Sequence, residues 1–169
     1  MVWAGQDTTS RQLRRALITF AQHPEQWRLL ASEPKLLPAA VNEILRWTPQ
    51  ARMIQRFAKE DVTYQGLDIA EGSPVFCCVA SAGRDPLAMP EPAHFDLRAP
   101  RPARQLVFGG GIHHCLGAAL GRLEISEALA ALTARFGPPV LSGTPTWPPL
   151  AVIHGPGSVP ARFTPRSHP

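Results

Sequence analysis

Apolar residues recur at helical spacing in the first part of the chain. Four of them lie three or four positions apart and would share one face, which predicts a helix over residues 4–22. Pro24 cannot continue that helix, but it suits the first turn of a short helix over residues 24–31. A third helix is predicted over residues 38–47, ended by Thr48-Pro49. The apolar positions of the first helix are Leu13, Ala16, Leu17 and Phe20.

After this region the pattern changes to short runs of β-branched and aromatic residues. Three such runs lie at residues 53–57, 62–64 and 75–80, separated by turn residues around Gly66 and Gly72. Runs of this length and composition are typical of strands. We therefore expect a small antiparallel sheet in the middle of the chain.

A proline-rich coil and a further helix follow the expected sheet. Residues 85–105 contain five prolines and little periodicity, and a coil of this length inside a domain commonly has a function. It leads into a glycine-rich loop at residues 108–117, after which we expect a helix that ends at Gly137-Pro138. The apolar residues expected on one side of that helix are Leu116, Leu120, Leu123, Leu129, Leu132 and Phe136.

The C-terminal tail has the pattern of a hairpin. Residues 150–153 are apolar, a turn is indicated at residues 154–157, and apolar residues then alternate over residues 159–163. Together with the other elements, this pattern predicts a mainly α-helical fold with a small antiparallel β-sheet.

Composition narrows the class of protein. The chain has 169 residues, of which 44% are hydrophobic and 18% charged, which fits one globular domain rather than a disordered chain. No apolar run is long enough for a transmembrane helix, and the first residues lack the pattern of a signal peptide. Three cysteines, two of them adjacent, form no disulfide framework and suit a reducing compartment such as the cytoplasm.

The charge of the chain is only mildly positive. The net charge is +4, and the 17 basic residues are scattered. This distribution gives little support for nucleic-acid binding, and an acidic protein partner fits at least as well.

The glycine-rich loop places Cys115 close to the start of the last long helix. Free amides and the helix dipole would stabilise a thiolate there, and three consecutive glycines would let a large flat ligand approach the backbone. Such a thiolate can act as a nucleophile, bind zinc or ligate haem iron. Zinc would need more ligands than His113, His114 and Cys115, and a nucleophile would need an oriented base. A buried structural cysteine is the remaining alternative.

Three motifs resemble those of one family. Phe108, Gly111, Cys115 and Gly117 match the pattern FxxGxxxCxG, which is the haem-binding signature of the cytochrome P-450 family of haem-thiolate monooxygenases. Residues 4–9 (Ala-Gly-Gln-Asp-Thr-Thr) resemble the family's oxygen-activating motif, and the segment Glu-Ile-Leu-Arg at residues 43–46 fits its ExxR motif. The motifs follow the family's order and spacing, and the resemblance runs from about residue 2 to residue 163.

This resemblance implies a cofactor and a reaction. Haem b would be bound through the thiolate of Cys115, which ligates the iron. The protein would activate O₂ and insert one oxygen atom into a small apolar organic substrate. Thr8 would hydrogen-bond the dioxygen, and Asp7 would feed protons from solvent. The sequence around His113 is similar to that of soluble bacterial members, which implies a cytoplasmic protein served by a ferredoxin-type or other electron donor, without nucleic acid or membrane.

The resemblance also assigns roles to further residues. His113 and Arg56 would hold the haem propionates. The pair Glu43 and Arg46 would lock the proline-rich coil, with His94 standing where the family often has a third, arginine partner. The electron donor would dock near Arg101, Arg104 and Arg122, and Trp3, residues 51–54 and the turn at His154 would face the substrate. The cofactor-binding residues implied are Ala4, Arg56, Phe108, Gly109, Gly111, His113, Cys115 and Gly117.

The family's domain is more than twice as long as this chain. Met1 would fall inside the long central helix, so residues 1–169 are expected to be the C-terminal part of such a domain, without its N-terminal half, from a truncated gene or a mis-assigned start. Two alternatives stay open. The chain is a haem-binding module or an inactive fragment that needs a separate N-terminal half, or it is a zinc or thiol protein without haem.

Overall fold

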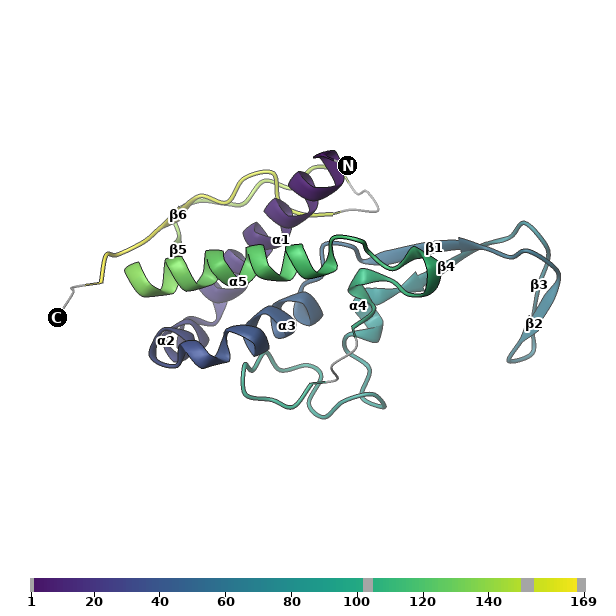
Figure 1. The fold of residues 1–169 in the computed structure, drawn as a ribbon, viewed down its shortest axis with the longest axis horizontal. Helices are drawn as coiled ribbons and strands as arrows, with labels where there is room; N and C mark the ends of the chain where they lie inside the picture. Colours follow the sequence, from purple (N-terminus) through teal and green to yellow (C-terminus); the bar gives the residue numbers. More distant parts are fainter. Residues whose placement is uncertain (1, 102–104, 150–153, 167–169) are drawn as a thin grey trace.

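The computed structural model describes residues 2–101, 105–149 and 154–166, with side chains from residue 5 onward. Four helices form its body: α1 (Val2–Gln22), α2 (Pro24–Ser32), α3 (Leu37–Trp47) and α5 (Ala118–Arg135). A long two-stranded ribbon projects from one end of this body (Figure 1). The fold is mainly helical with small antiparallel sheets, which confirms the predicted class.

The core lies where the four helices meet. Trp27 and Phe20 are fully buried and contact each other edge to face, with their ring centroids 5.3 Å apart. The indole nitrogen of Trp27 donates a hydrogen bond to the carbonyl of Phe136, so burial leaves no polar atom of this ring unpaired. Ile44 and Leu129 complete the centre from α3 and α5. Each such side chain stabilises the fold by roughly 1.5–3 kcal/mol.

Helix α5 does not carry its leucines on one side, as the sequence pattern predicted. Leu129 is 1% exposed, whereas Leu120 and Leu123 are 59% and 55% exposed. The prediction was wrong because nine positions separate Leu120 from Leu129. At about 3.6 residues per turn this is two and a half turns, which puts the two side chains on opposite faces.

The middle of the chain forms two separate two-stranded sheets rather than one sheet. Strand β1 (Met53–Phe57) pairs antiparallel with β4 (Pro74–Cys78), and β2 (Val62–Tyr64) pairs with β3 (Leu67–Ile69) at the far end of the ribbon. The sequence missed β3, which follows a tight turn at Gly66, where φ is +81°. The strand predicted over residues 75–80 ends earlier than expected, because a short helix α4 (Val79–Ala82) begins after β4.

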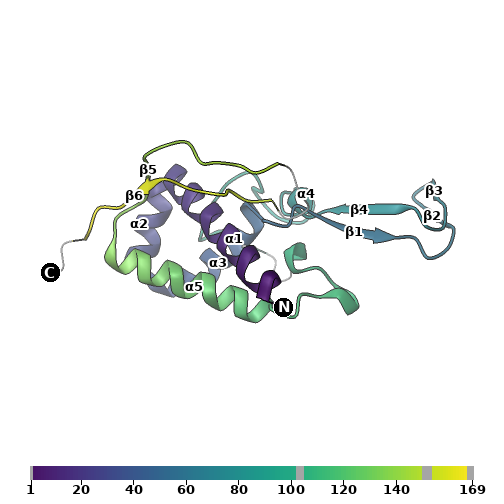
Figure 2. The ribbon, with the colours of Figure 1, turned by 90° about the horizontal axis from the view of Figure 1, so that it is seen from above.

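The C-terminal strand has a partner that the sequence did not predict. Strand β6 (Ala161–Arg162) pairs with β5 (Val140–Leu141), just after α5. The expected partner, residues 150–153, lies outside the described residues. Figure 2 shows the C-terminal segment running along the helical body beside α1.

Among the residues that the structure describes, three short 3₁₀ turns lie in the connections: η1 (Pro34–Leu36), η2 (Leu106–Phe108) and η3 (Gly111–His113). The last two belong to the glycine-rich loop. No helix in the described ranges combines the length and the apolar character needed to cross a bilayer.

Candidate functional site

A buried ion pair joins two residues of α3. Arg46 Nε donates to Glu43 Oε2 and Arg46 Nη2 to Glu43 Oε1, each at 2.7 Å. The two side chains are 2% and 1% exposed. Residues three apart on a helix share one face, and here that face points into the molecule. The pair is therefore part of the interior and not a solvated surface contact.

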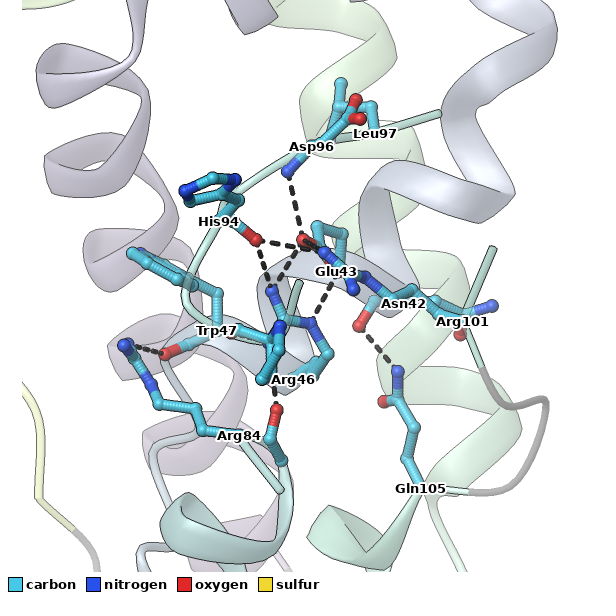
Figure 3. A network of polar contacts seen from close by, with 12 residues as sticks. Asn42, Glu43, Arg46, Trp47, Arg84, His94, Asp96, Leu97, Arg101 and Gln105 are labelled. Carbon is cyan, nitrogen blue, oxygen red and sulfur yellow. Dashed lines mark hydrogen bonds and ion pairs between the residues drawn. The ribbon is translucent and has the colours of Figure 1, made fainter. Parts of the chain in front are cut away.

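Arg101 is the third charged member of this network (Figure 3). Its Nε lies 3.0 Å from Glu43 Oε2 and its Nη2 lies 3.1 Å from Oε1. The prediction that Arg101 faces an electron donor is wrong, because its side chain is only 6% exposed. The resemblance implied a third, arginine partner but placed it at position 94, and Arg101 itself stands between two prolines in a coil without periodicity.

His94 contributes to the network through its backbone only. Its carbonyl accepts hydrogen bonds from Arg46 and Arg101, both at 2.9 Å. Its imidazole is 70% exposed and lies 3.8 Å from Glu91. The side chain of His94 thus does not stand in for the third partner, and Arg101 takes that place.

The network ties the proline-rich coil to α3. Arg46 also donates to the carbonyls of Gly83 and Pro92, and the Asp96 amide donates to Glu43 Oε1 at 3.0 Å. Burial alone would raise the pKa of Glu43, but the hydrogen bonds from Arg46, Arg101 and Asp96 bring this pKa below its ordinary value. The carboxylate therefore stays ionised at the centre of the anchor.

The loop after the coil presents Cys115 to solvent. The Cys115 amide donates to the Phe108 carbonyl at 2.8 Å, which closes the loop. Gly109 and Gly111 have φ values of +71° and +64°, a region that favours glycine. Within the described chain, the amides of Leu116 and Gly117 donate no hydrogen bond. The thiol is exposed beside them, as expected for a sulfur near a helix start.

Two cavities meet at Cys115 and Phe108, which line both of them. The larger, of about 660 Å³, is also lined by Arg56 and His113. The smaller, of about 250 Å³, lies against α1 and is lined by Thr8 among others. The structure therefore brings together predicted residues from α1, β1 and the loop. Those that line one or both cavities are Thr8, Arg56, Phe108, Gly109, His113, Cys115 and Gly117.

Other predicted residues do not line these cavities. The carboxylate of Asp7 accepts a hydrogen bond from Arg11 Nε at 2.8 Å and is 29% exposed. Gly111 shapes the loop through its positive φ. Arg122 is half-buried, with its guanidinium 4.9 Å from the centre of the Phe108 ring. The side chains of Trp3 and Ala4 and the whole of Arg104 lie outside the described residues.

Two glutamines of the smaller cavity were not predicted. Gln12 is 2% exposed; its Nε2 donates to the Thr48 carbonyl and its Oε1 accepts from the Gln50 amide, each at 3.0 Å. The side-chain oxygen of Gln50 is buried without a partner in the described chain. Gln12 could have been found from the sequence, because it is a polar residue four positions before Ala16 on the apolar face of α1.

The residues around Cys115 fit a flat, anionic, iron-containing cofactor. One exposed thiol, one guanidinium and one imidazole line the larger cavity. A Cβ added at Gly5, which lines the smaller cavity, would meet nothing within 4 Å, so the face of α1 is open there. In the described part of the chain no three His, Cys, Asp or Glu side chains gather into a metal site. The larger cavity thus offers one thiol beside cationic groups, which is the set of groups that the predicted haem would need.

Comparisons with known proteins identify the family of the chain. The family model described as Cytochrome P-450 matches residues 1–152. Luteothin monooxygenase of Streptomyces thioluteus is 45% identical over 161 residues, which cover 95% of this chain and 40% of that protein. Mycinamicin IV hydroxylase/epoxidase of Micromonospora griseorubida is 36% identical over 163 residues, covering 93% of this chain and 41% of that protein.

A solved structure of a cytochrome P-450 also matches this chain. Cytochrome CYP109Q5 from Chondromyces apiculatus superposes with a TM-score of 0.89 at 36% identity, covering 98% of this chain and 43% of that one. The chain thus spans about 40% of the length of the curated relatives it matches. Motifs, fold and relatives lead to one conclusion: the chain belongs to the cytochrome P-450 family.

Proposed function

We propose that the chain is the haem-binding and oxygen-handling part of a haem-thiolate monooxygenase, running from the central helix to the C-terminal strands. The complete reaction would insert one oxygen atom of O₂ into a small apolar organic substrate. The observation that carries this proposal is the position of Cys115 at the junction of two cavities, one lined by Thr8 and the other by Arg56 and His113. The names of the two relatives, a monooxygenase and a hydroxylase/epoxidase, support the reaction class.

The loop residues would hold haem b. The thiolate of Cys115 would ligate the iron, and Arg56 and His113 would pair with the propionates at the edge of the larger cavity. When bound, the haem supplies O₂ activation, which thiolate ligation directs toward O–O cleavage. Gly117 keeps the sulfur accessible, since an added Cβ there would lie 4.0 Å from Cys115 Sγ.

The residues of α1 would handle the proton. Thr8 lines the smaller cavity, so its hydroxyl would hold a proton at the reacting side of the site. Asp7 directly precedes Thr8 in the chain and is partly exposed. Its carboxylate would therefore take protons from solvent and pass them to Thr8. Arg11 holds that carboxylate at 2.8 Å and also donates to the Gly155 carbonyl. Transfer would therefore require Asp7 to release Arg11.

Electrons would come from a ferredoxin-type or other donor protein in the cytoplasm. With Arg101 buried, the donor's docking face near the loop would rest on Arg104 and Arg122. Neither a membrane nor a nucleic acid has a part in this proposal.

Haemin titration of the purified chain tests the proposal. Wild type should bind haemin with a saturable change in the Soret region, and Cys115→Ala should weaken binding and change the spectrum. Cys78→Ala is the matched control, because Cys78 is also an exposed thiol and lies on β4. Equal effects of the two substitutions would contradict ligation by Cys115.

A second candidate is a haem-binding module that does not turn over alone and requires a separate N-terminal half. Ile112 and Leu116 are 94% and 88% exposed, and Leu120 and Leu123 of α5 are 59% and 55% exposed. Large apolar side chains exposed on a loop and on the helix that follows it favour a contact with another segment or protein. On this candidate the chain binds haem weakly and is inactive. Steady NADPH-driven turnover by the chain with an electron donor would rule it out.

A further inference from the structure

A third cavity lies away from Cys115 and is lined by arginines. Its volume is about 610 Å³, within the range of about 300–1,000 Å³ that small-molecule sites have. It shares no lining residue with either cavity at Cys115. We call it the arginine pocket; its walls include Arg15, Arg52, Arg84, Trp47, Trp147 and His154.

The arginine pocket has three arginines on its walls and no carboxylate, and the Glu43 carboxylate acts only on Arg84, from outside the pocket. None of its lining residues is Asp or Glu. In the described chain, the ion pairs of arginine involve Asp7, Glu33 and Glu43 and leave Arg15, Arg52 and Arg84 without an acidic partner. Like charges gathered in this way repel each other, so the pocket favours an anion.

Two of the three guanidiniums are held in place by neutral groups. Arg15 Nε donates to the His154 carbonyl at 2.8 Å, and Arg15 Nη1 donates to Thr48 Oγ1 at 2.9 Å. Arg84 Nη2 donates to the Trp47 carbonyl at 2.9 Å and its guanidinium lies 3.9 Å from the centre of that indole ring (Figure 3). These contacts orient the cations and leave their charge unneutralised.

The electrostatics of the pocket agree with its geometry. Burial and the neighbouring Arg52 lower the pKa of Arg15 to about 10, so it stays protonated at neutral pH. Burial and three arginines lower the pKa of His154, which keeps its imidazole neutral. The Nδ1 atom of this imidazole is buried and has no partner in the described chain.

The walls of the pocket suit an apolar body beside an anionic group. The imidazole of His154 stacks on Trp147 with ring centroids 5.3 Å apart, and Trp47 lines the pocket with Pro49 and Ala80. We propose that the arginine pocket binds a small organic acid, with its carboxylate on Arg15 and Arg52 and its apolar part against the two indoles. Arg52 and His154 belong to segments that the family resemblance places toward the substrate, but the pocket shares no lining residue with the two cavities at Cys115.

Titration with benzoate, followed by intrinsic tryptophan fluorescence, tests this proposal on the chain without haem. Benzoate should bind saturably, and its neutral isostere benzamide should not. Arg52→Gln should weaken benzoate binding about tenfold, because one charge-assisted contact is lost. The side chain of Arg52 makes no hydrogen bond in the described chain, and the substitution keeps its carbonyl, which accepts from the Ala80 amide at 3.2 Å, so the fold should stay intact.

Two further variants make the result specific. Arg28→Gln makes the same charge change at an exposed site on α2 and should bind benzoate as wild type does. Cys115→Ala should also bind it normally, which separates this site from the haem site. The proposal is overturned if benzoate does not saturate, if benzamide binds equally well, or if Arg52→Gln and Arg28→Gln have the same effect.

Discussion

Glu43 is the residue on which the anchor of the coil depends. It accepts from two guanidiniums and one backbone amide while it is 1% exposed. Removing one partner of a buried charge pair leaves the other charge uncompensated, which typically costs about 3–5 kcal/mol. The charge arrangement, more than any single contact, holds the coil against α3.

The pH dependence of stability should report on Glu43. Its pKa is lower in the folded chain than its ordinary value of 4.5. Stability from this group is therefore complete above pH 4.5 and is lost as the pH falls through the lowered folded value. Urea unfolding of wild type should show this acid loss, and Glu43→Gln, though less stable throughout, should show a smaller one. An unchanged acid loss in the variant would contradict this assignment.

Substitutions of Arg101 and of His94 should differ in how much they lower the free energy of unfolding. Arg101→Met should lower the free energy of unfolding by about 1.5–3 kcal/mol, because charge-assisted hydrogen bonds to Glu43 are lost. His94→Ala should change it by less than about 0.5 kcal/mol, because the imidazole is exposed and only the carbonyl is used. Urea unfolding curves measure both. A larger loss for His94→Ala than for Arg101→Met would show that the imidazole is the third partner.

Helix α5 has one face in the core and another face exposed to solvent. It packs into the core through Ile125 and Leu129, while Leu120 and Leu123 remain exposed on the opposite face. The first part of the same helix lines the smaller cavity at Cys115. One element thus links the core to the candidate haem site.

A pair of leucine truncations tests this division of α5. Leu129→Ala should lower the free energy of unfolding by about 2–5 kcal/mol, because a buried side chain leaves a cavity. Leu123→Ala removes the same atoms from an exposed position and should cost less than about 0.5 kcal/mol. Equal losses in thermal or urea unfolding would mean that the exposed face is also buried in the protein as it is purified.

Local patterns predicted the helices better than the sheets. The first three helices followed from apolar spacing and from prolines at their ends, because these signals act within one element. The pairing of Ala161 with Leu141 and the short strand at Leu67 depend on contacts between segments or on a two-residue turn. The pattern of residues within one strand indicates neither its pairing partner nor a strand of three residues after a tight turn.

The candidate site was predictable where a motif fixed it. Cys115, Thr8 and the Glu43–Arg46 pair came from motifs, and the structure places them at the cavities and in the anchor. Arg101 could not be predicted, because its role depends on how a coil without periodicity folds back onto α3. The roles of Arg56 and His113 toward a cofactor stay predictions, although both line the larger cavity.

At the scale of the whole molecule, the candidate site is assembled from distant parts of the chain. Residues of α1, of β1 and of the loop before α5 line the cavities at Cys115, and the buried network holds the coil that carries this loop. The chain matches about 40% of the length of its curated relatives. The central claim is that this portion contains a thiolate ligand and a haem cradle.

The absorption spectrum of the haemin-reconstituted chain, after reduction and addition of carbon monoxide, tests this claim most directly. We predict the red-shifted Soret band of thiolate-ligated haem for wild type and for Cys78→Ala, and its loss in Cys115→Ala. A reduced carbon monoxide complex of wild type with the band of histidine-ligated or unligated haem, unchanged by Cys115→Ala, would contradict the account.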